Sequence, residues 1–136
     1  MARRTALGTG TLVLDSEGLS KAAGFDERTA AFIKTALLEQ ARVVVPAVTL
    51  AEVLRGGPRD ASVHRVLKNF EVAVVTGEVG RAAGELLGEM GGKNAIDAIV
   101  AAVARSASGP VVLLTSDVDD LMRLTDGCDD IAVQHV

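Results

Sequence analysis

Short apolar runs alternate along the chain with segments in which apolar residues recur at helical spacing. Because the runs are continuously apolar, we expect strands covered on both faces by helices. The pattern therefore predicts an α/β fold of three layers, with a mostly parallel central sheet of about five strands flanked by helices. The expected strands are Leu12–Leu14, Val43–Val45, Val72–Val75, Val111–Leu114 and Ile131–Val136. The expected helices are Ser16–Ala23, Glu27–Ala41, Thr49–Leu54, Arg59–Asn69, Val79–Met90, Ala95–Ser106 and Val118–Leu124.

Composition limits the partners that the protein can have. The chain has 136 residues, of which 49% are hydrophobic and only 2% aromatic, so one domain with an aliphatic core is expected. The net charge of −4 excludes a general basic surface for nucleic acid. A local basic patch or a metal-bridged contact with phosphate remains open.

The N-terminal residues, the lengths of the apolar runs and the single cysteine predict where the protein is located in the cell. Residues 1–10 lack the apolar core of a signal peptide, and we expect them to be a short flexible lead before a domain at 11–136. No apolar run is long enough to span a membrane. Cys128 has no partner for an internal disulfide, which favours a reducing compartment. These features predict a cytoplasmic protein without a membrane contact.

Acidic residues follow the predicted strands or begin the helices after them. Because the carboxyl ends of parallel strands meet at one edge of the sheet, ligands bind there in such folds. We therefore expect these acids to converge on one site. They are Asp15, Glu52, Asp97 and Asp117.

Each of these acids also has a purely structural explanation as a helix cap. Side chains of Ser, Asn and Asp accept hydrogen bonds from the first amides of a helix, and a Thr-x-x-Glu sequence can form a capping box. Taken singly, the structural explanation is about as good as the functional one. The pairs with capping-box spacing are Thr49–Glu52 and Asn94–Asp97, and the residues placed to cap a following helix are Asp15, Ser116 and Asp117.

Two observations favour a shared metal site. Asp97 is surrounded by apolar residues in "NAIDAIVAA", which a solvated cap does not need. Two like charges about 4 Å apart repel by about 4 kcal/mol at an effective dielectric near 20, so four clustered carboxylates need a cation. Oxygen ligands without His or Cys select hard ions, Mg²⁺ or Mn²⁺. Such an ion can hold a phosphodiester and activate a water molecule.

The segments "LVLDSEGL", "VPAVTLAEVLRG", "NAIDAIVAAVA" and "LLTSDVDDL" resemble, in this order and spacing, the acidic motifs of PIN domains, and most of all those of VapC-type toxins. The resemblance covers nearly the whole chain. It implies a PIN-like domain with metal-dependent endoribonuclease activity, a homodimer, and a cognate antitoxin that covers the active-site groove. The first acid, Asp15, comes later in the chain than is usual in such toxins.

The resemblance also assigns residues. It implies that Asp15, Glu52, Asp97 and Asp117 are catalytic and hold Mg²⁺ or Mn²⁺. Hydroxyl and acidic residues around the fourth motif are expected to support this set: Thr115, Ser116, Asp119 and Asp120. Basic residues near the second and third motifs are candidates for contacts with RNA phosphates, although ordinary solvated surface charge is the somewhat better explanation for them: Arg55, Arg59 and Lys93.

Other functions fit the sequence less well. A degenerate PIN domain that only binds a partner or RNA is the main alternative, and the presence of all four acids argues against it. A phospho-receiver needs an Asp after the third strand, where the chain has "VVTGE". A haloacid-type phosphatase needs Asp-x-Asp after the first strand, where the chain has Asp15-Ser-Glu17.

Three glycines recur at every fourth position of one predicted helix: Gly80, Gly84 and Gly88. Each costs about 1 kcal/mol relative to Ala in a helix interior. The stripe is therefore expected to allow close packing, either within the core or in an oligomer.

Overall fold

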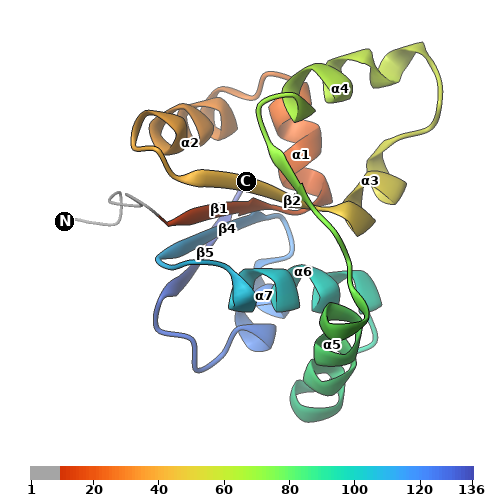
Figure 1. Ribbon diagram of the computed structural model, residues 1–136, viewed down its shortest axis with the longest axis vertical. Helices are drawn as coiled ribbons and strands as arrows, with labels where there is room; N and C mark the ends of the chain where they lie inside the picture. The colour runs from red at the N-terminus through yellow and green to blue at the C-terminus, as the bar shows by residue number, and fades with distance from the viewer. Residues whose placement is uncertain (1–9) are drawn as a thin grey trace.

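The computed structural model describes residues 10–136 as three layers, shown in Figure 1. The strands are β1 (Thr11–Leu14), β2 (Arg42–Pro46), β3 (Glu71–Ala73), β4 (Val111–Thr115) and β5 (Ile131–His135). The α-helices are α1 (Ser16–Ala23), α2 (Glu27–Leu38), α3 (Ala47–Val53), α4 (Ala61–Leu67), α5 (Gly77–Met90), α6 (Ala95–Ser106) and α7 (Val118–Leu124). A 3₁₀ turn at Pro58–Asp60 precedes α4. The predicted α/β fold class is confirmed.

The sheet has the order β3-β2-β1-β4-β5, and all its strand pairs are parallel. The first strand, β1, lies at the centre, where Thr11 pairs with Arg42 on one side and with Val111 on the other. All four residues of β1 are fully buried. The strand that delivers Asp15 is therefore the most enclosed part of the fold, and it fixes the position of this acid.

Each face of the sheet has its own apolar core. Leu12 and Leu14 face the layer of α1, α2 and α4, whereas Val13 faces the layer of α5, α6 and α7 (Figure 1). This alternation is the period of two expected for a strand whose two faces are both covered. Because the cores lie on opposite faces, the open edge at the carboxyl ends of β1 and β4 lies between them.

Among the differences between the expected and the observed element boundaries, two have a clear local cause. The helix predicted over Glu27–Ala41 ends at Leu38, because Gln40 takes a left-handed conformation with φ of 63° that a helix does not continue through. The helix predicted to begin at Thr49 begins at Ala47, directly after Pro46. Pro46 therefore ends the strand and starts the helix without a loop.

The glycine stripe of α5 does not pack into the core. A Cβ atom added at Gly80, Gly84 or Gly88 would meet no atom within 4 Å, and all three residues are exposed. Core packing is therefore the wrong explanation for these glycines. The face of α5 that packs against α6 is instead formed by larger residues, among them Ala83 and Leu86.

Residues 1–9 of the predicted N-terminal lead lie outside the described residues, and Gly10 accepts a hydrogen bond from the amide of Arg42. Within residues 10–136, none of the helices combines the length and the apolar character that crossing a membrane requires.

Candidate metal site

Asp97 is a buried acid in the first turn of α6. It is 8% exposed, and its amide donates a hydrogen bond of 3.0 Å to the side chain of Asn94, the N-cap of the helix. Asn94 therefore acts as the predicted cap, and the carboxylate of Asp97 is not needed for that purpose. Its Oδ2 atom is the one buried side-chain nitrogen or oxygen atom without a hydrogen-bond partner in the described part of the chain.

Two acids at the start of α7, one of them its N-cap residue, approach Asp97. One carboxylate oxygen each from Asp97, Asp117 and Asp120 lies within 4.8 Å of the other two. Asp117 precedes α7 as its N-cap residue, but its side chain makes no capping hydrogen bond. The helix-cap explanation therefore does not account for Asp117. We call these three acids the acid cluster.

The environment of the acid cluster disfavours the charge on Asp97. The pKa of Asp97 is raised from 3.8 to about 7, first by burial and then by a hydrogen bond with Asp117 and by the charges of Asp117, Asp120 and Asp15. Without a cation, the cluster thus retains a proton near neutral pH. A buried carboxylate with no partner on one oxygen, beside two further acids, is an arrangement that a divalent cation would stabilise.

Asp15 lies outside the acid cluster but is connected to it through Thr115. The hydroxyl of the fully buried Thr115 accepts a hydrogen bond of 2.9 Å from the amide of Asp117. The same hydroxyl donates a hydrogen bond to the carboxylate of Asp15. Asp15 is 6% exposed, and burial raises its pKa, although the hydrogen bonds from Thr115 and from the amide of Gly18 oppose this shift. Thr115 therefore links the end of β1 to the start of α7.

Asp15 serves two structural purposes at once. Its Oδ1 atom accepts a hydrogen bond of 2.8 Å from the amide of Gly18, which caps α1. Gly18 allows α1 to lie close to β4, because a Cβ atom there would be 3.1 Å from the carbonyl oxygen of Leu114. The predicted cap and the predicted approach to the acid cluster are therefore both present at Asp15.

Glu52 does not belong to the acid cluster. It is exposed on α3, a helix that packs against α6. The capping box with Thr49 is wrong, because Thr49 lies inside the helix and its hydroxyl donates to the carbonyl of Pro46. The carboxylate of Glu52 therefore does not have the capping role that its spacing from Thr49 predicted.

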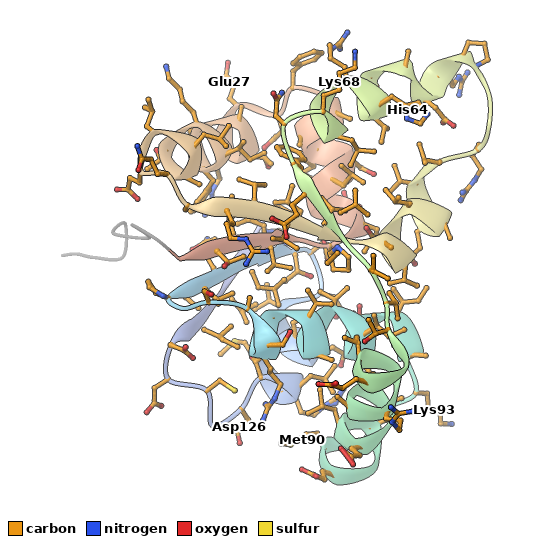
Figure 2. The ribbon with its side chains drawn as sticks, viewed as in Figure 1. Glu27, His64, Lys68, Met90, Lys93 and Asp126 are labelled. Carbon is orange, nitrogen blue, oxygen red and sulfur yellow. The ribbon has the colours of Figure 1, made fainter. Side chains whose placement is uncertain are left out.

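The remaining predicted residues lie at the surface. Ser116 and Asp119 are near the cluster in sequence, and neither is buried. Arg55 is exposed, and its guanidinium donates to the carbonyl oxygens of the last turn of α3. Arg59 is exposed after the loop that follows α3, and Figure 2 places the exposed Lys93 in the loop after α5.

Two residues take part in the site more directly than the sequence predicted. The motif resemblance gives Asp120 only a supporting position, yet this residue belongs to the cluster. Arg123 lies outside every motif, although its Nη2 atom is 3.0 Å from Oδ1 of Asp120. The spacing of three residues on one helix was the available signal, because side chains at i and i+3 are neighbours.

The donors fit a hard divalent cation. The ligand atoms that the cluster offers are carboxylate oxygens, and the unpartnered Oδ2 atom of Asp97 is available without breaking an existing hydrogen bond. The molecule is therefore an α/β domain with an all-carboxylate site at the carboxyl edge of a parallel sheet.

The chain belongs to the PIN domain family, whose sequence model matches residues 12–126. No curated protein matches the chain significantly. The expected membership in this family is confirmed, and it agrees with the order of the four acidic motifs.

Solved structures with the same fold come from toxin–antitoxin complexes. One is VapBC2 from Rickettsia felis bound to a DNA fragment from the promoter, with a TM-score of 0.70, 13% identity, and coverage of 93% of this chain and 98% of that one. Another is a toxin–antitoxin complex from Klebsiella pneumoniae, with a TM-score of 0.62, 17% identity and coverage of 89% and 95%. A third is VapBC-5 from Mycobacterium tuberculosis, with a TM-score of 0.54, 24% identity and coverage of 93% and 99%.

Proposed function

We propose that the protein is a Mg²⁺- or Mn²⁺-dependent endoribonuclease and the toxin of a type II toxin–antitoxin pair, acting in the cytoplasm. The observation that carries this proposal is the buried, unpartnered Oδ2 atom of Asp97 within the acid cluster. Membership in the PIN domain family and the likeness to VapBC complexes support it.

Each residue of the site has a separate role in this proposal. Asp97, Asp117 and Asp120 hold the cation, and Asp15 adds negative charge from the end of β1. A cation held by these residues would supply a Lewis acid that orients the scissile phosphate and a water molecule of lowered pKa for the attack. Thr115 holds Asp15 and Asp117 in their relative positions, and Glu52, which lies outside the acid cluster, remains a proposed fourth acid of the site.

RNA would approach from the open edge of the sheet. Arg59 and Lys93 are exposed and remain proposed contacts for backbone phosphates, and Arg55 joins them if its guanidinium leaves the end of α3. Contacts of this kind bind the backbone and do not select a base sequence. We therefore expect the choice of target to depend on RNA shape or on the partner protein.

The proposed antitoxin needs an apolar surface on which to dock. A groove of about 410 Å³ between α2 and α4 offers one, with Phe25 and Leu38 exposed by 65% and 75%. We propose that an amphipathic helix of the antitoxin occupies this groove, because helices bind apolar grooves through residues spaced by three and four positions. We also propose that the toxin is a homodimer, which light scattering of the purified protein would test.

Replacing Leu38 with Asp is expected to weaken antitoxin binding at least about tenfold, because a charge would enter the apolar groove. The antitoxin candidate is the product of a small reading frame adjacent to the gene, and its affinity is measured by calorimetry. Val74→Asp is the matched control, since Val74 is 72% exposed but lies outside the groove. Equal affinities for the two variants would contradict the docking site.

A direct assay tests the nuclease. Purified protein loaded with Mn²⁺ is expected to cleave structured RNA, and EDTA in excess is expected to stop cleavage, because the carboxylates alone repel the phosphate. Re-addition of Mn²⁺ to the same sample is the control that shows whether EDTA has inactivated the protein irreversibly. Cleavage that continues at an unchanged rate in EDTA would contradict metal dependence.

A degenerate PIN domain remains the second candidate, because Glu52 lies outside the acid cluster. This alternative predicts partner or RNA binding without cleavage. Calorimetry distinguishes the two: a catalytic site binds Mn²⁺, whereas a site without affinity for the ion favours the degenerate domain.

A further inference from the structure

Arg123 brings a positive charge directly to the acid cluster. Its Nη2 atom is 3.0 Å from Oδ1 of Asp120, one turn earlier on α7. Among residues 10–136, it is the basic residue that forms an ion pair with a member of the cluster. Both side chains are partly exposed, at 36% for Arg123 and 42% for Asp120. The pair therefore lies at the solvent side of the cluster, where a cation would enter.

The guanidinium of Arg123 lies close to the loop between α5 and α6. Gly92 has a φ of 112°, and a Cβ atom there would lie 2.8 Å from Nη2 of Arg123 and 3.5 Å from its Cζ. Any other residue would both strain the backbone and displace the guanidinium. The same loop leads into α6 and thus to Asp97. The guanidinium of Arg123 therefore lies between Asp120 on α7 and Gly92 in this loop.

Resting on the proposed metal-dependent function, we infer that Arg123 is the resident cation of the acid cluster, with which a divalent ion must compete for Asp120. Arg123 neutralises one of the three carboxylates and so reduces their mutual repulsion in the metal-free protein. A divalent ion bound to Asp120 would stand within a few ångströms of the guanidinium. The two cations repel each other, and one oxygen of Asp120 cannot serve both fully.

Arg123 is in this view a positioning residue that sets metal affinity and does not itself hold the ion. Repulsion between a divalent ion and a single positive charge at this separation, weakened by solvent, corresponds to about a three- to tenfold loss of metal affinity. Removing the charge of Arg123 should therefore tighten metal binding. A residue needed only to brace the fold would have the opposite effect or none, because loosening Asp120 does not improve a binding site.

The test is Mn²⁺ binding to the full chain by isothermal titration calorimetry, without RNA. Arg123→Gln is expected to bind Mn²⁺ about three- to tenfold more tightly than the unmodified protein. Arg123→Lys, which retains the charge, is expected to remain near the unmodified affinity. Arg28→Gln loses the same charge on α2, away from the cluster, and is expected to leave the affinity unchanged. Circular dichroism of each metal-free variant checks that it is folded.

The outcomes separate this inference from the proposed function. If the unmodified protein binds Mn²⁺ and Arg123→Gln binds it equally or more weakly, the resident-cation inference is overturned and the metal site stands. The inference is likewise overturned if Arg123→Lys binds as tightly as Arg123→Gln, because charge would then be irrelevant. If the unmodified protein binds no Mn²⁺, the metal site itself fails and this inference with it.

Discussion

Replacing Asp97 with Asn is expected to lower metal-dependent RNA cleavage at least about a hundredfold while making the metal-free protein more stable above pH 7. The loss of cleavage follows because the amide removes a charged oxygen from the middle of the acid cluster. The gain in stability follows because Asp97 is buried beside two other acids, with Oδ2 unpartnered. An Asn of the same shape carries no charge there.

The sign of the stability effect can be worked out from the pKa. In the folded protein the pKa of Asp97 is about 7, above its ordinary value of 3.8, so the folded state binds a proton that the unfolded state has already released. The free energy of unfolding therefore falls as the pH rises from about 4 to about 7. Asp97→Asn removes this fall and should be more stable than the unmodified protein at pH 8 by about 1–3 kcal/mol.

Urea unfolding at pH 5 and pH 8, with EDTA present, measures this difference. Asp119→Asn is the matched control, because Asp119 lies on the same helix but outside the cluster. The control should retain both cleavage and the pH dependence of the unmodified protein. Full cleavage by Asp97→Asn would remove Asp97 from the site, and a variant less stable at pH 8 would mean that its carboxylate is stabilised by a partner.

The affinity for Mn²⁺ is expected to rise about tenfold per pH unit below pH 7 and to level off above it. The ion and the proton compete for Asp97, because a carboxylate binds a metal in its ionised form. With the pKa of Asp97 raised to about 7, one proton must leave on binding at pH 6 and almost none at pH 8. The affinity for Mn²⁺ thus changes in a pH range where a carboxylate with an ordinary pKa, which is already ionised, would cause no change.

Calorimetry in two buffers of different ionisation enthalpy counts the protons released at each pH. About one proton per ion is expected at pH 6. Asp119→Asn again serves as the control and should show the same profile. An affinity that stays constant between pH 6 and pH 8, with no proton released, would contradict competition at Asp97.

The sequence predicted the edge of the sheet at which the acids gather. The end of a strand and the apolar neighbours of an acid can both be recognised from a few consecutive residues. "LVLD" fixes a buried strand that ends in an acid, and the apolar context of Asp97 already distinguished it from a solvated cap. Strand–helix alternation predicted parallel strands but not their order, and it is the observed pairing of β1 with β4 that brings the positions after both strands together.

What the sequence did not predict depends on side-chain direction and on the exact start of each helix. The two-residue shift in the start of α3 turned Thr49 inward and removed the capping box that its spacing from Glu52 indicated. Asp119 and Asp120 are adjacent in sequence, and only the rotation of α7 decides that Asp120 faces Asp97. The exposed glycines of α5 could not be distinguished from buried ones, because a small residue fits either environment.

The central position of β1 has a consequence for the order of folding. Thr11 bonds to Ser108, which is 97 positions away, and β1 pairs with β4 only after that long loop has closed. Loop closure of this length is slow, and contacts that depend on it form late. The repulsion between Asp15 and the acids at the start of α7 therefore requires this long-range pairing to have formed. A bound metal ion should accordingly act on the rate of unfolding far more than on the rate of folding.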